Sequence, residues 1–91
     1  MNEERQLKTV YEEKKEMFEK VKEIIVDTIS CNPDDVKLES RLEEDLSMDS
    51  LDAVQVNMNI KILNTLNYYI FFDTVQLLVN YLLELIKILT F

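Results

Sequence analysis

Hydrophobic residues recur every three or four positions through the first third of the chain. The series runs from Leu7 to Ile29, and such spacing is typical of one face of an amphipathic helix. Lys14 interrupts the series, so we expect the part of the helix before Met17 to pack less firmly. Because a proline disfavours helical backbone at the residue before it, the helix is expected to stop ahead of Pro33, where a turn follows.

The next stretch has neither helical nor strand periodicity and is expected to be a loop that ends at Asp49. Apolar residues spaced along this loop can hold it against a core: Val36, Leu38, Leu42 and Leu46. A long loop held by its own apolar residues is usually functional. The pattern then predicts a second helix from Ser50, with Asp49 as its N-cap and Asp52 as the acidic partner of a capping box.

The rest of the chain indicates further helix. One face of the second helix carries Leu51, Val54, Met58 and Ile62. That helix should end near Asn64, the segment from Tyr68 to Phe72 has room for a single turn or short helix, and a last helix begins at Asp73 or Thr74. The predicted fold is all-α: a small bundle of three main helices plus a short turn or helix, with a long structured loop between the first two helices.

Apolar residues surround most of the last helix and leave only a narrow polar seam of Gln76, Asn80, Glu84 and Lys87. These polar residues recur about once per helical turn, so we do not expect the helix to span a membrane. Two other helices can cover only one face of it, so some apolar surface should remain exposed. The sequence therefore predicts either self-association through the last helix or a groove for a partner; a fully packed core helix is the alternative.

The composition of the 91-residue chain excludes several kinds of chemistry. The chain has no histidine, the commonest general base and metal ligand, and no glycine for a phosphate-binding loop. A lone cysteine, Cys31, excludes an internal disulfide and a multi-cysteine zinc site. We expect Cys31 to be a small, buried hydrophobic side chain rather than a reactive thiol, and we expect the reducing cytoplasm as the location.

The net charge of −8 is concentrated in one segment, since residues 24–53 contain nine acidic and only two basic residues. Such a chain should be repelled by nucleic acid and by anionic membranes, and its charged partners should be basic proteins. Three carboxylates stand in a row at Glu43, Glu44 and Asp45. Consecutive carboxylates do not easily converge on one ion, so we interpret them as a solvated acidic face and predict no metal site.

The end of the loop and the start of the second helix read Leu42-Glu43-Glu44-Asp45-Leu46-Ser47-Met48-Asp49-Ser50-Leu51-Asp52. This segment resembles the acyl carrier protein family, whose members hold an L-x-x-D-L turn followed by D-S-L at the start of the second helix. The resemblance extends roughly from Met17 to the C-terminus and includes Thr74-Val75 at the start of the last helix. It suggests a single carrier domain over 1–91, with a core at 17–91 and an N-terminal extension at 1–16.

The resemblance implies that Ser50 carries a covalent 4′-phosphopantetheine cofactor, with Asp49 and Leu51 as motif neighbours. The chain would then be no enzyme. It would be a carrier of acyl intermediates, held as thioesters on the arm for fatty acid or related biosynthesis. A phosphopantetheinyl transferase would install the arm from coenzyme A, and basic acyl-processing enzymes would recognise the carrier. The candidate recognition residues are Glu43, Glu44, Asp45, Asp52, Leu51, Val54 and Met58.

The residues themselves support a modified serine over a catalytic one, because Ser50 has no histidine to activate it and lies at a helix start within reach of solvent. Met48 and Met58 are candidates to flank the arm, with core filling as the alternative for Met58. The chain departs from the family at Ser47, where glycine is common, and in the few acids that follow Asp52. Three alternatives stay open: a specialised carrier for polyketide, peptide or lipid-modifying pathways, an unmodified helical interaction module, and a Ser50 that merely begins a helix.

Overall fold

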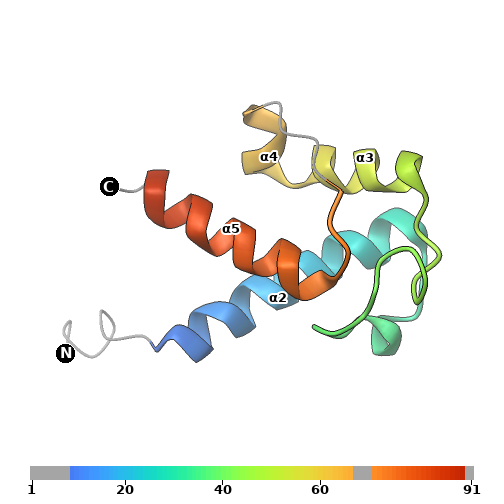
Figure 1. Cartoon of the computed structure of the whole chain (residues 1–91), viewed down its shortest axis with the longest axis horizontal. Helices are drawn as coiled ribbons and strands as arrows, with labels where there is room; N and C mark the ends of the chain where they lie inside the picture. Colours follow the sequence, from blue (N-terminus) through green and yellow to red (C-terminus); the bar gives the residue numbers. More distant parts are fainter. Residues whose placement is uncertain (1–8, 67–70, 90–91) are drawn as a thin grey trace.

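The computed structural model describes residues 9–66 and 71–89. In these ranges the elements are α2 (Val10–Ile29), η1 (Pro33–Asp35), α3 (Ser50–Asn59), α4 (Lys61–Thr65) and α5 (Val75–Leu89). Helix α5 packs on α2 and crosses it obliquely, while α3 begins at the end of the molecule opposite the start of α2 (Figure 1). The described residues form no strand, and the predicted all-α bundle with three main helices and one short helix is confirmed.

Helix α2 begins at a side-chain cap and ends at a residue in the left-handed region. The Thr9 hydroxyl oxygen accepts a hydrogen bond of 3.1 Å from a backbone N–H of the first turn. At the other end, Ser30 has φ 56° and donates its backbone N–H to the Val26 carbonyl at 2.8 Å. The helix therefore ends before Pro33, as expected, and Pro33 is the first residue of η1, which forms the predicted turn.

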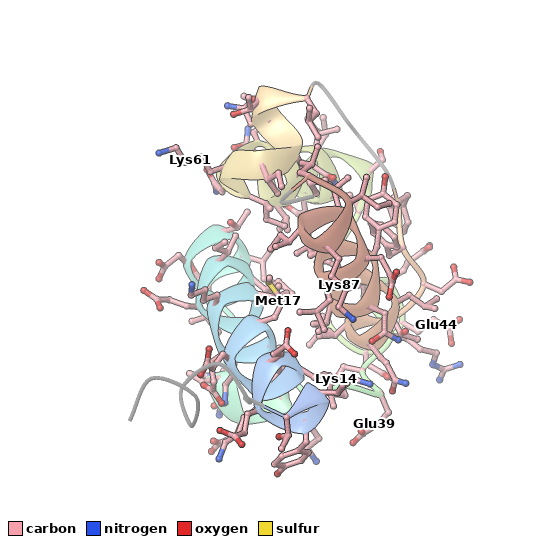
Figure 2. The ribbon with its side chains drawn as sticks, turned by 90° about the vertical axis from the view of Figure 1, so that its left-hand side faces the viewer. Lys14, Met17, Glu39, Glu44, Lys61 and Lys87 are labelled. Atoms are coloured by element: carbon pink, nitrogen blue, oxygen red, sulfur yellow. The ribbon has the colours of Figure 1, made fainter. Side chains whose placement is uncertain are left out.

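The first turns of α2 contribute little to the core. Val10 is 67% and Tyr11 73% exposed, and full burial on this helix begins only at Val21. Met17 is half-buried and points from α2 toward α5 (Figure 2). The weaker packing expected before Met17 is confirmed, and the predicted apolar stripe is not buried at Val10 and Tyr11. Leu7 lies outside the described residues.

The core draws buried side chains from every α-helix and from the long loop. Its largest fully buried side chains are Ile25, Met48, Leu63 and Leu82. Removal of this apolar surface from water, at about 25 cal/mol per Å², is the main stabilising term. Met48 is only 1% exposed. The expectation that Met48 flanks the site together with Met58 is therefore wrong, because Met48 fills the core beneath the loop.

The long loop is structured and tied to the start of α5. Its anchors Val36, Leu42 and Leu46 are buried and Leu38 is half-buried, as expected. Three backbone hydrogen bonds join the two segments: Gln76 N–H to Leu38 O at 2.8 Å, Val75 N–H to Ser40 O at 3.0 Å, and Leu42 N–H to Asp73 O at 3.0 Å. The loop thus brings the residues before α3 against the start of α5.

The predicted second helix is divided at Ile60, whose backbone is extended (φ −86°, ψ 105°). The division lets Ile60 and Leu63, 5% and 0% exposed, both enter the core. Just before it, the buried Asn57 amide donates a 2.7 Å hydrogen bond to the Ala53 carbonyl. Such side-chain hydrogen bonds compete with regular helix.

The short helix therefore lies earlier than expected. It is α4, at Lys61–Thr65, whereas the sequence pattern placed a short element at Tyr68 to Phe72. Residues 67–70 of that segment lie outside the described residues. The last helix starts as predicted, because the Thr74 hydroxyl accepts a 3.2 Å hydrogen bond from the Leu77 N–H.

Candidate functional site at the start of helix α3

Ser50 is the first residue of α3 and is exposed to solvent. Its hydroxyl forms no hydrogen bond with any residue that the structure describes, and the chain has no histidine to deprotonate it. A serine without a general base is a weak nucleophile. The environment of Ser50 therefore suits a serine that another enzyme modifies, and it lacks the partners that a catalytic serine requires.

Asp49 and Asp52 form a reciprocal capping box around Ser50. The Asp49 carboxylate accepts a 2.8 Å hydrogen bond from the Asp52 N–H, and the Asp52 carboxylate accepts a 3.3 Å bond from the Asp49 N–H. This confirms the predicted cap, which fixes where the helix starts. It leaves the N–H groups of Ser50 and Leu51 at the helix end without a backbone acceptor in the described part of the chain.

The loop immediately before the cap is anchored on both sides of Ser47. Leu46 and Met48 are buried on either side of Ser47, and Met48 donates its N–H to the Leu42 carbonyl at 2.9 Å. Ser47 itself has φ 58°, in the left-handed region. A residue with a Cβ adopts this conformation at a cost of about 1–2 kcal/mol, so the tight turn expected at Ser47 forms despite the absence of glycine.

An exposed apolar strip continues from Ser50 along α3. Leu51 is 75%, Val54 39% and Met58 44% exposed, and their spacing of three and four residues places them on one face. The opposite face, with Ala53 and Val56, is buried. The structure thus brings the predicted apolar recognition residues together beside Ser50.

The predicted acidic residues differ in what they contact. Arg41 forms ion pairs with Glu44 at 2.5 Å and with Asp45 at 3.7 Å. The Asp45 carboxylate also accepts the Arg41 backbone N–H at 2.8 Å, so it stabilises the turn 41–46. Glu43 is exposed and forms no ion pair within the described residues. Arg41 was not among the predicted site residues, although its spacing of three and four positions from Glu44 and Asp45 is that of side-chain pairs in a helical turn.

Other predicted features fall outside this site. Cys31 is half-buried rather than buried as expected, and this partial burial raises the pKa of its thiol, which agrees with the expectation of an unreactive side chain. No group of three or more acidic or cysteine side chains in the described ranges is placed to hold a metal ion. Among the helices described, none is both long enough and apolar enough to cross a bilayer.

Comparison with known proteins identifies similar chains over about half the sequence. The acyl carrier protein of Petrotoga mobilis is 53% identical over 45 residues, which is 50% of this chain and 53% of the relative. That of Campylobacter hominis is 46% identical over 43 residues (47% of this chain, 54% of the relative), and one from Clostridium perfringens is 50% identical over 42 residues (46% and 55%). The chain thus spans about half the length of the curated relatives it matches.

No family model and no solved structure matches the chain. The resemblance inferred from the residues around Ser50 is nevertheless confirmed by these relatives. Their shared name describes a carrier and not an enzyme, in agreement with the expectation that this chain is no enzyme.

Proposed function

We propose that this chain, related over about half its length to acyl carrier proteins, carries acyl groups on a 4′-phosphopantetheine arm attached to Ser50. The observation that supports this most directly is the exposed Ser50 hydroxyl at the start of α3, beside an exposed apolar strip. When bound, the arm supplies the thiol that holds an acyl group as a thioester. The domain organisation, with an extension at 1–16 and a core at 17–91, belongs to the same proposal, as does the cytoplasmic location.

The residues around Ser50 suit a phosphodiester on its hydroxyl. The N–H groups of Ser50 and Leu51 point out of the helix end, where an anion is stabilised by the helix dipole. Asp49 and Asp52 oppose it by charge, but their carboxylates accept hydrogen bonds from each other's N–H groups. Ser50 would therefore bear the phosphodiester, while the capping hydrogen bonds of Asp49 and Asp52 fix the start of the helix.

The partner enzymes would recognise the surface beside the site. Leu51, Val54 and Met58 offer apolar contacts, and Glu43 and Glu44 offer exposed carboxylates to a basic surface. Attraction between opposite charges of this kind raises the association rate, and salt weakens that attraction by screening it. A phosphopantetheinyl transferase and basic acyl-processing enzymes are the proposed partners.

Intact-mass measurement after incubation with coenzyme A and a promiscuous phosphopantetheinyl transferase tests the proposal. The chain should gain the mass of one phosphopantetheine, and Ser50→Ala should gain none while keeping its helical circular dichroism. Ser47→Gly is the matched control, because it removes a neighbouring hydroxyl at a position with φ 58°, a conformation that glycine adopts without strain. This variant should still be modified. Modification of Ser50→Ala would refute the attachment site, and a chain that is never modified would favour the unmodified interaction module.

A further inference from the structure

Arg41 places a positive charge inside the surface that the proposed function assigns to basic partners. Its side chain is 56% exposed and reaches Glu44 and Asp45, whose side chains are 63% and 45% exposed. Two of the three consecutive carboxylates are therefore paired within the chain. Of these three carboxylates, Glu43 alone forms no ion pair with a described residue.

A hollow of about 240 Å³ adjoins this pair, between the acidic loop and the start of α5. It is lined by Arg41, Glu43, Glu44, Phe71 and Asp73. Glu44 lies at the outer surface of the molecule, where a partner can reach it (Figure 2). Three of the five lining residues are acidic and one is Arg41, so the hollow suits a cationic side chain that competes with Arg41.

Lys37 offers a comparison for Arg41, because these are the two basic residues of the acidic segment 24–53. Lys37 is exposed and forms no ion pair with a described residue. Its charge lowers the overall field of the segment as much as that of Arg41 does. The two residues differ in contact: Arg41 touches carboxylates of the recognition surface and Lys37 does not.

We propose that Arg41 is a specificity-determining residue, which competes with the cationic side chains of a partner for Glu44 and Asp45. The inference rests on the proposed function, since it concerns the same recognition surface. The Arg41 guanidinium reaches two carboxylates through separate nitrogens, Nη1 toward Glu44 and Nε toward Asp45, which the single ammonium nitrogen of a lysine cannot reproduce. A partner must displace Arg41 to bind Glu44 and Asp45; a partner that leaves Arg41 in place is confined to Glu43 and Asp73.

The test measures binding of a fluorescein-labelled, lysine-rich amphipathic helical peptide by fluorescence anisotropy, at low salt and at about 0.15 M salt. The variants are Arg41→Gln and the matched control Lys37→Gln, which change the net charge equally. Since an exposed ion pair is worth up to about 1 kcal/mol, Arg41→Gln should raise the affinity about fivefold at low salt. Lys37→Gln should raise it by no more than about twofold, as a screened charge at a distance does.

A second pair of variants locates the effect. In a Glu44→Gln background, Arg41→Gln should raise the affinity by only about twofold, because the main competing pair is already lost. Arg41→Lys keeps the charge but has one nitrogen in place of two, so it should give a smaller gain than Arg41→Gln and provides the test if the glutamine variant fails to fold.

Equal gains for Arg41→Gln and Lys37→Gln would overturn the inference, since net charge alone would then explain both. The inference would also be overturned if neither the native chain nor any variant bound the peptide at either salt concentration. The peptide requires no arm on Ser50, so neither outcome depends on whether Ser50 is modified.

Discussion

Asn59, the last residue of α3, donates a hydrogen bond of 3.0 Å from its side-chain amide to the Thr28 hydroxyl on α2. The Thr28 hydroxyl in turn donates to the Ile24 carbonyl at 2.7 Å. The two residues are 31 positions apart in the chain, so the bond fixes the end of α3 against the end of α2. It holds α3 at the point just before the chain bends at Ile60.

Loss of this bond should destabilise the bundle modestly. Asn59→Ala and Thr28→Ala should each lower the free energy of unfolding by about 1 kcal/mol, the usual value of one hydrogen bond. Urea denaturation of the two single variants and the double variant gives their coupling energy, which we expect to be at least about 0.5 kcal/mol. Asn64→Ala, on the exposed surface of α4, serves as the control. Strictly additive effects would show that the bond contributes nothing.

The left-handed backbone at Ser47 predicts a stabilising substitution. Ser47→Gly removes the Cβ at a residue with φ 58° and should raise the free energy of unfolding by up to about 1 kcal/mol. Ser47→Val should lower it by about 1–2 kcal/mol, because a β-branched side chain disfavours this conformation more strongly. Thermal or urea unfolding measures both, and Ser30→Gly at φ 56° should behave like Ser47→Gly. A destabilised Ser47→Gly would contradict the assignment of strain to this turn.

Asp49 should matter for the fold through its hydrogen bond. Asp49→Ala removes the N-cap and should cost about 1 kcal/mol, whereas Asp49→Asn retains an acceptor and should cost only a few tenths. Chemical denaturation gives these values, and the mass assay on the same variants shows whether the transferase also needs the Asp49 charge. Equal losses of stability in the two variants would indicate that charge, rather than the hydrogen bond, fixes the helix start.

Helix α5 exposes part of its apolar surface, as the sequence predicted, since Leu77 is 48% and Ile88 68% exposed. If self-association uses this surface, light scattering should show a mass that rises with concentration, and Leu77→Gln with Ile88→Gln should abolish the rise without loss of helix. Leu82 is 1% exposed, so Leu82→Ala should instead destabilise the fold by about 2–5 kcal/mol. A monomer at all concentrations would exclude self-association.

The Cys31 thiol should react slowly. Burial raises its pKa, so the folded chain holds less thiolate than the unfolded chain at a given pH. The stabilisation from this group is present below the ordinary pKa of a thiol and is lost as the pH rises through the raised value. Alkylation by iodoacetamide, followed by mass, should be slower in the native protein than in urea, and should accelerate at higher pH in the native state. Equal rates in both states would contradict this.

Local signals in the sequence predicted the elements that depend on neighbouring residues. The two residues of the capping box, Asp49 and Asp52, are three positions apart. The turn at Pro33 depends on the proline ring, which restricts the backbone of the residue before it. Both formed where the sequence placed them. The exposed face of Leu51, Val54 and Met58 likewise follows from helical spacing alone.

Features that depend on tertiary packing were not accessible from the pattern. Apolar periodicity continues through Ile60, so it could not show that the chain bends there to bury Ile60 and Leu63 together. Met48 stands beside the motif in sequence, yet its side chain turns into the core because the loop folds back on Leu42. The pairing of Arg41 with Glu44 is local, but charge counting over the whole segment concealed it.

The three backbone hydrogen bonds between the loop and the start of α5 also have a kinetic consequence. They join the two ends of the segment that contains α3 and α4. This segment is therefore a loop that paired backbone closes at its base. Amide protons at Leu42, Val75 and Gln76 can then exchange with deuterium only when that base opens, and all three should do so together.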